Sequence, residues 1–190
     1  MTTTPDCDVT FVLRTFDDEE RVGHALRRAA SWLSAHGLRS EILVADEGSG
    51  DNTLAVAVML RPDIPNLTLI HADPGAGFRD ACRRARGRIV VLADARTDAP
   101  LASIGYALGR LREGLDVVAL GGRYLVFRRT HAWRAFEALG TRRRDPAAVA
   151  RRFVRRARAL GLACVVTHRP EKRRWSRLLA SFRPFRTMEI

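Results

Sequence analysis

Five acidic residues of this sequence lie where apolar stretches end. They are Asp17, Asp18, Asp46, Glu47 and Asp94. Carboxylates can hold a divalent cation, because hard cations prefer oxygen ligands, and they accept hydrogen bonds from the N–H and O–H groups of a ligand. A flexible turn, "GSGD" at 48–51, follows the acids at the end of the second stretch. Residue types of this kind, repeated at the ends of apolar stretches, indicate a binding site.

The elements that would position these acids alternate along the chain. Residues typical of buried strands occupy 8–15, 40–46, 66–72, 88–94 and 116–122. Helical spacing of apolar residues occupies 17–37, 51–60, 75–87 and 101–114. The first helix is expected to open with a capping box of Asp17 and Glu20, and the third to end at Gly87. The alternation predicts an α/β fold with a mostly parallel central sheet and helices on both faces, in which ligands bind at the carboxyl ends of the strands.

The pattern changes after residue 121. The segment 121–129 is expected to be a strand or one arm of a hairpin, and 162–168 a short strand. Helical patterns occupy 130–140, 145–161 and 171–185, and the last places Trp175 and Phe182 on an apolar face among arginines. No internal repeat or linker separates these segments from the rest, so a single domain of 190 residues is expected.

Composition narrows the classes of protein further. Apolar residues make up 46% of the chain, enough for a core, and no apolar run reaches the roughly 18 residues that cross a membrane. The N-terminus has no secretory signal pattern, and three widely spaced cysteines argue against disulfides or a zinc site, so a cytoplasmic location is expected. Residues 121–190 contain 19 of the 33 basic residues but only 4 of the 21 acidic ones. A basic region of this kind indicates an anionic partner.

Five short segments of the sequence are more informative together, in their order along the chain, than any one of them alone. They are "VLRTFDDE" at 12–19, "VADEGSGDNT" at 44–53, "DPGAGFRDA" at 73–81, "LADARTDAP" at 92–100 and "GGRYLVFRRTHAWRAF" at 121–136. In order and spacing they resemble the motifs of family 2 glycosyltransferases with the GT-A fold, of which the chain looks like a shortened and divergent member. The resemblance implies a single GT-A-like (Rossmann-like) domain. Its nucleotide-binding half would be 8–122, and 123–190 would be a basic, acceptor-side part.

The resemblance also implies an activity and a site. The chain would move a hexose from a UDP- or GDP-sugar to an acceptor, with inversion. The implied nucleotide-sugar site consists of Arg14, Thr15, Phe16, Asp18, Asp46, Gly75, Gly77, Arg79, Asp94 and Arg96. Thr15, Phe16 and Asp18 would wall the base and the ribose, while Asp46 would accept a hydrogen bond from the base. Gly75, Gly77 and Arg79 would lie close to the nucleoside, and Asp94 would be the first acid of the metal motif.

The chain departs from the family pattern at two places. Arg96 stands at the position where the family's metal motif has its second acid. Either Asp94 still holds Mg²⁺ or Mn²⁺, or the Arg96 guanidinium takes the place of the metal and pairs with the diphosphate. The catalytic base is the other departure, because none of the four acids after residue 121 lies in a matching motif. The alternative to an enzyme is therefore a catalytically inactive member that uses the fold for binding.

Structural and other functional interpretations stay open for several features. Asp17 and Asp18 could cap a helix, and "DEGSGD" could be a plain turn. The glycines of "GAGFRD" lack the third glycine of a dinucleotide fingerprint. The basic helix at 171–185 could lie on the inner face of a membrane. Binding of nucleic acid through "RRFVRRAR" is not expected, since no recognised nucleic-acid module accompanies it.

Overall fold

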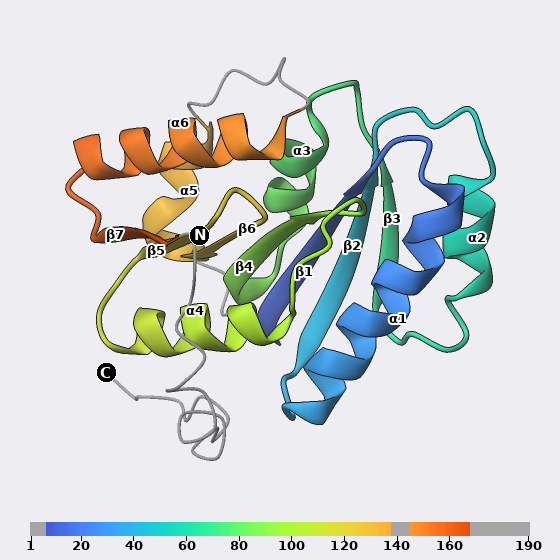
Figure 1. Ribbon diagram of the computed structural model, residues 1–190, viewed down its shortest axis with the longest axis horizontal. Coiled ribbons are helices and arrows are strands. Elements are labelled where there is room, and N and C mark those ends of the chain that lie inside the picture. Colours follow the sequence, from blue (N-terminus) through green and yellow to red (C-terminus); the bar gives the residue numbers. More distant parts are fainter. Residues whose placement is uncertain (1–6, 138–144, 168–190) are drawn as a thin grey trace.

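Strands form one sheet at the centre of the molecule (Figure 1). The structure, a computed structural model, describes residues 7–137 and 145–167, and the helix expected at 171–185 lies outside them. Within these residues the sheet has seven strands in the order β3-β2-β1-β4-β6-β5-β7. The strands are β1 Cys7–Thr15, β2 Ser40–Asp46, β3 Leu67–His71, β4 Gly87–Asp94, β5 Val117–Leu120, β6 Tyr124–Arg128 and β7 Cys164–Thr167. All the expected strands therefore form, and they join a single sheet.

The sheet is mostly parallel, as the alternation of elements predicts. Strands β1, β2, β3 and β4 are parallel neighbours, and β7 is parallel to β5. Strand β6 is the exception, because it pairs antiparallel with both β4 and β5. It returns from β5 through a turn at Gly121 and Gly122, whose φ angles are +55° and +71°. Residues other than glycine rarely adopt such angles. The segment 121–129 is thus the hairpin arm, and it lies inside the sheet.

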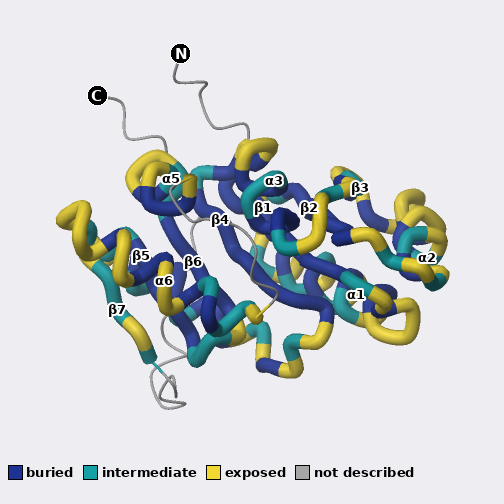
Figure 2. Tube along the Cα trace, turned by 90° about the horizontal axis from the view of Figure 1, so that it is seen from above, coloured by how far each residue is buried: buried dark blue, intermediate teal, exposed yellow. Residues whose placement is uncertain are grey.

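Six helices among the described residues cover the two faces of the sheet. They are α1 Glu19–Ala35, α2 Thr53–Met59, α3 Gly77–Arg84, α4 Ala102–Arg112, α5 Arg129–Glu137 and α6 Pro146–Ala159. One core packs α1, α2 and α4 against side chains such as Phe11 and Leu13, and the other packs α3, α5 and α6 against residues such as Val12. Figure 2 shows the buried strands running between exposed outer helix surfaces. No helix of the described residues is long and apolar enough to span a bilayer.

Two helix boundaries differ from the predictions, and tertiary contacts explain both. Helix α1 begins at Glu19, and Asp17 lies outside it with φ of +50°, so the capping box of Asp17 and Glu20 is wrong. Asp17 instead accepts a hydrogen bond from the backbone of Gly50, in a neighbouring loop. Gly87 does not end the third helix but opens β4, where a Cβ atom would lie 2.4 Å from the backbone N of Thr10.

Candidate functional site

The register of the parallel strands brings the predicted acids to one edge of the sheet. Thr15 at the end of β1 stands opposite Asp46 at the end of β2. On the other side of β1, Arg14 stands opposite Asp94 at the end of β4. The carboxyl ends of three adjacent strands therefore lie level with each other, which is where ligands bind in sheets of this type.

Arg14 and Asp94 form an ion pair at this edge. The Nε and Nη2 atoms of Arg14 both donate to Oδ2 of Asp94, at 2.9 and 2.5 Å. Both side chains are about nine-tenths buried. The guanidinium also lies over the ring of Phe78 on α3, 5.1 Å from its centroid, a cation–π contact. Burial and three contacts hold Arg14 against Asp94.

Arg96 connects the end of β4 to the loop after β1. Its Nε donates to Oδ1 of Asp18 at 2.8 Å, and its Nη2 donates to the carbonyl oxygen of Phe16 at 2.7 Å. Its backbone N–H donates to Oδ1 of Asp94 at 3.0 Å. The hydrogen bond to Asp18 raises the pKa of Arg96 above its usual value. The side chain is still 57% exposed, so its fixed positive charge faces the solvent at the edge of the sheet.

The loops after β1 and β2 are bound to each other by hydrogen bonds. The backbone N–H of Asp17 donates to Oγ of Ser49 at 3.0 Å, and Oδ1 of Asp17 accepts from the backbone of Gly50 at 2.8 Å. Next to this pair, the backbone N–H of Glu19 donates to Asp51 at 3.1 Å. The acids of "DEGSGD" and of "FDDE" thus shape the two loops as one unit.

Asp46 is buried and holds the turn that follows it. Its carboxylate accepts hydrogen bonds from Oγ1 of Thr15 at 3.1 Å, from the backbone N–H groups of Gly48 and Ser49 at 3.2 and 3.0 Å, and from the Ser49 hydroxyl. Four donors saturate a carboxylate. The expected hydrogen bond from a nucleotide base to Asp46 stays a prediction. The contacts in the structure show that the Asp46 side chain stabilises the turn after β2.

Glu47 and Gly77 meet next to this cluster. Oε1 of Glu47 accepts a hydrogen bond from the backbone N–H of Gly77, at 3.0 Å, and the Glu47 side chain is buried. Glu47 is one of the five acids at the ends of the apolar stretches but not one of the ten residues of the implied nucleotide-sugar site, although its place in the "DEGSGD" motif is a usable signal. Gly75, with φ of +82°, makes the turn before α3. Arg79 lies on α3 and donates from Nε to its neighbour Asp80.

The donor atoms at this place do not fit a divalent metal ion. Both oxygens of Asp94 already accept hydrogen bonds, from Arg14 and from the backbone of Arg96. The position of the second acid carries the guanidinium of Arg96. In residues 7–137 and 145–167, no three His, Cys, Asp or Glu side chains are grouped so that they could hold a metal ion. Mg²⁺ and Mn²⁺ need several oxygen ligands, and the cluster offers them two arginines instead.

Two of the four acids on the acceptor side lie among the described residues, and their contacts there do not identify a catalytic base. Asp145 caps α6 by accepting hydrogen bonds from the backbones of Ala147 and Ala148, at 3.0 and 3.1 Å. Glu137 is the last residue of α5. Glu171 and Glu189 lie outside the described residues. The catalytic residue left unassigned by the sequence stays unassigned.

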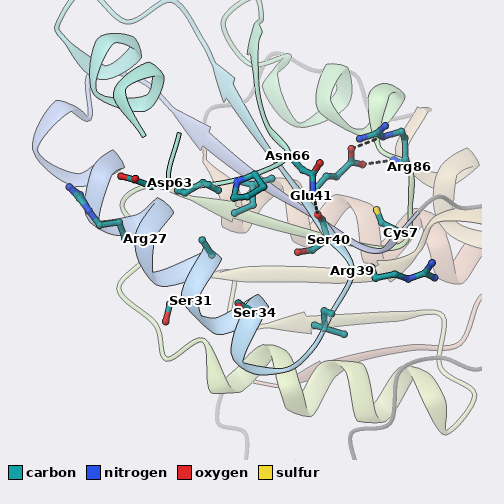
Figure 3. Close-up of a pocket in the computed structure, with 15 residues that line it drawn as sticks. Cys7, Arg27, Ser31, Ser34, Arg39, Ser40, Glu41, Asp63, Asn66 and Arg86 are labelled. Atoms are coloured by element: carbon teal, nitrogen blue, oxygen red, sulfur yellow. Dashed lines mark hydrogen bonds and ion pairs between the residues drawn. The ribbon is translucent and has the colours of Figure 1, made fainter. Parts of the chain in front are cut away.

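A cavity of about 780 Å³ lies at the opposite end of the sheet (Figure 3). It is bounded by Arg27, Ser31 and Ser34 of α1 and by residues where the strands begin, such as Ser40. Glu41, in the same wall, is bound by the guanidinium of Arg86. None of the ten predicted site residues lines this cavity. It is thus separate from the cluster at the carboxyl ends of the strands.

Comparison with known proteins places the chain in a family. The sequence model of glycosyl transferase family 2 matches residues 10–174. A dolichyl-phosphate beta-glucosyltransferase, ALG5D of Trichomonas vaginalis, is 21% identical over 85% of this chain and 48% of its own length. The succinoglycan biosynthesis protein ExoO of Rhizobium meliloti is 31% identical over 62% of this chain and 36% of its own length. The chain therefore spans about half the length, or less, of these curated relatives.

Solved structures show the same fold. The mannosyltransferase PcManGT from Pyrobaculum calidifontis, in complex with GDP-Man and Mn²⁺, superposes with a TM-score of 0.62 at 18% identity, over 89% of this chain and 59% of that one. Glucosyl-3-phosphoglycerate synthase from Mycobacterium tuberculosis, in complex with Mn²⁺, UDP and glucosyl-3-phosphoglycerate, gives a TM-score of 0.61 at 16% identity, over 93% of this chain and 76% of that one. With its matching family model and this architecture, the chain belongs to glycosyl transferase family 2 and has the GT-A fold.

Proposed function

We propose that the chain transfers a glycosyl group from a nucleoside-diphosphate sugar to an acceptor hydroxyl at the carboxyl-end edge of β1, β2 and β4. Family membership supports the reaction class. The single observation that supports the placement is the connected cluster at this edge, in which Arg96 is hydrogen-bonded to both Asp18 and Phe16 while its side chain stays more than half exposed. Relatives with this fold hold GDP-Man or UDP, which supports a nucleotide sugar as the donor.

The proposed reaction is a displacement at the anomeric carbon of the donor sugar. The acceptor oxygen forms a bond to that carbon, the bond to the diphosphate oxygen breaks, and the configuration inverts. The proton of the acceptor hydroxyl passes to a base that the described residues do not identify. Negative charge grows on the departing diphosphate, and a fixed cation beside it lowers the barrier. Arg96 supplies that charge, since guanidinium groups bind phosphate oxygens through directed N–H donors.

The nucleoside is proposed to lie between the loops after β1 and β2 and the start of α3. Thr15, Phe16 and Asp18 form the β1 side of this region. Gly75 lies in the turn before α3, Gly77 is the first residue of α3, and Arg79 follows on the same helix. The donor is a UDP- or GDP-sugar under this proposal, because solved relatives hold both kinds of nucleotide.

A second candidate function is binding without catalysis. Two observations favour it: Asp145, an acid on the acceptor side, is used as a helix cap, and Asp94 is neutralised by Arg14. Under this alternative the chain binds a nucleotide sugar or a partner protein but does not release nucleotide from it.

Calorimetric titration of the full chain with UDP, GDP, UDP-glucose and GDP-mannose tests the proposal. Binding, followed by slow release of UDP or GDP from the bound sugar nucleotide, supports the transferase. Binding with no release over a day supports the second candidate in its nucleotide-sugar form. No binding of any of the four rejects the transferase and favours the second candidate in its partner-protein form. Arg96→Ala should weaken the affinity, whereas the control Arg27→Ala, in the wall of the separate cavity, should leave it unchanged.

The basic C-terminal part is proposed to bring the chain to the cytoplasmic face of an anionic membrane. Exposed arginines on α6 support an anionic partner, and they are Arg151, Arg152, Arg155, Arg156 and Arg158. The helix expected at 171–185 lies outside the described residues. Co-sedimentation with vesicles of phosphatidylglycerol, compared with neutral phosphatidylcholine vesicles, tests this contact. Equal recovery with both vesicles would contradict it.

A further inference from the structure

The place that would hold a divalent cation is occupied by two arginines, one on β1 and one in the turn after β4. Arg14 approaches Asp94 from β1, and Arg96 replaces the second acid two residues after Asp94. Both arginines have carboxylate partners, Asp94 for the first and Asp18 for the second. The carboxylates of Asp94 and Asp18 are therefore each paired with a guanidinium rather than with a metal ion.

The fold fixes the position of the Arg14 side chain, which is buried and not a mobile surface group. Its strand partner across the β1–β4 ladder is Asp94 itself, so the register alone brings the two together. Two N–H groups donate to one carboxylate oxygen, and Phe78 covers the guanidinium. A metal ion could reach Asp94 only after this buried pair separated, which would leave Arg14 buried beside a second positive charge.

The remaining oxygen of Asp94 is also used. Oδ1 accepts the backbone N–H of Arg96, and the backbone N–H of Asp94 donates to Oγ1 of Thr97 at 3.2 Å. These bonds close the turn after β4 and direct the Arg96 side chain toward Asp18. Asp94 therefore positions the guanidinium of Arg96, two residues further along the chain.

From this geometry we propose that the chain binds the donor diphosphate without a divalent metal. Arg14 stays paired with Asp94, and Arg96 provides the positive charge that faces the phosphates. The inference rests on the proposed function for the identity of the ligand. Its first part, that Arg14 and Arg96 together close the metal site, can be tested with no nucleotide present. Arg14 acts as a positioning residue, and Arg96 is the residue that would touch the ligand.

The first experiment measures Mn²⁺ binding to the full chain, by the loss of the free Mn²⁺ signal in electron paramagnetic resonance. Neither the wild type nor R96D should bind Mn²⁺, since Arg14 still holds Asp94 in both. The double variant R14M/R96D frees Asp94 and restores a second acid, so it should gain binding. Wild-type binding that Asp94→Asn abolishes would overturn the inference, as would a folded R14M/R96D that binds no Mn²⁺. If the double variant does not fold, R96D decides: binding by R96D refutes the role of Arg14, and its absence supports it.

The second experiment titrates UDP and GDP into the wild type with excess EDTA or with Mn²⁺. Equal affinity in both conditions, with a loss of about tenfold or more in Arg96→Ala, is the expected result for a charged hydrogen bond to phosphate. An affinity that requires Mn²⁺ would overturn the inference. No binding of either nucleotide in either condition would reject the proposed function instead, while the Mn²⁺ result of the first experiment would stand. Arg61→Ala, at an exposed arginine of the α2–β3 connection, is the matched control.

Discussion

The carboxylate of Glu47 caps the first turn of α3 through the backbone of Gly77. Helix α3 has no capping side chain of its own, and Oε1 of Glu47, reaching from the end of β2, accepts the N–H of its first residue. A negative charge at a helix N-terminus is favourable, and the bond satisfies a donor that the helix cannot. A Cβ atom at position 77 would lie only 2.8 Å from that oxygen and 3.3 Å from Cγ of Arg14. The contact therefore requires glycine at this position.

Gly77→Ala should destabilise the fold by about 1–3 kcal/mol, because the added methyl group displaces Glu47 and leaves its buried carboxylate without the N–H donor. For a chain of this size the melting temperature should fall by roughly 2–4 °C for each kcal/mol. Thermal unfolding followed by circular dichroism measures the change. Gly50→Ala is the control, since its Cβ would meet nothing closer than Asp17 at 4.0 Å. Equal melting temperatures for the two variants would contradict the role given to Glu47.

Arg14→Met should cost about 3–5 kcal/mol of unfolding free energy, because it leaves the buried Asp94 carboxylate without its partner. The double variant R14M/D94N removes both charges and should be less destabilised than the single one. Urea unfolding of the wild type, both single variants and the double variant closes the cycle. If the two single losses simply add up in the double variant, the pair is not coupled and the cluster does not depend on it.

The sequence was sufficient to predict the strands and the edge at which their acids meet. Apolar, β-branched stretches separated by helical spacing admit few arrangements other than a mostly parallel sheet, and such a sheet aligns the strand ends. The pairing of Arg14 with Asp94 could not be predicted in this way. It depends on β4 lying beside β1, although β2 and β3 lie between them in the chain. A contact between strands that are not consecutive is set by the whole sheet rather than by any local pattern.

Local rules also failed where a tertiary partner competed for the same side chain. Asp17 has the residue type of a helix cap, but its carboxylate receives the backbone N–H of Gly50 instead. At Asp46, spacing alone did not reveal the four donors from its own neighbourhood that its carboxylate accepts, and the contact to a base stays a prediction. Spacing identifies residues that can do chemistry, whereas the competition between partners decides what each one does.

The turn after β2 offers a graded test of Asp46. Asp46→Ala leaves the N–H groups of Gly48 and Ser49 without an acceptor and should cost about 1–3 kcal/mol. Asp46→Asn should cost less, because its amide oxygen can still accept from those two N–H groups while its NH₂ donates to the hydroxyls of Thr15 and Ser49. Hydrogen exchange at the Ser49 amide, followed by NMR, should accelerate more in the alanine variant. Equal acceleration in the two variants, which both lack the carboxylate charge, would show that charge rather than hydrogen bonding holds the turn.

The contact between Asp116 and His131 predicts how the free energy of unfolding depends on pH. Oδ1 of Asp116 lies 2.6 Å from Nδ1 of His131, and its Oδ2 accepts the backbone N–H of Ala163 at 3.0 Å. Burial, the largest influence, works to raise the pKa of Asp116, but the hydrogen bonds from His131 and Ala163 and the nearby charges outweigh it and hold the pKa below its usual value of 3.8. A carboxyl whose pKa is lowered by folding stabilises the native state above that usual value, and the contribution is lost as the pH falls through the lowered pKa.

His131→Ala should therefore be less stable than the wild type at pH 7, by about 0.5–1 kcal/mol since the imidazole is more than half exposed. The difference should shrink below about pH 4, where protonation of Asp116 removes the charge that the imidazole contacts. Urea unfolding from pH 7 to pH 3 measures both values. His24→Ala, at an exposed position of α1, controls for the loss of a histidine and should leave the curve unchanged. A difference between wild type and His131→Ala that stays constant down to pH 3 would mean that the contact stabilises by packing and not through the Asp116 charge.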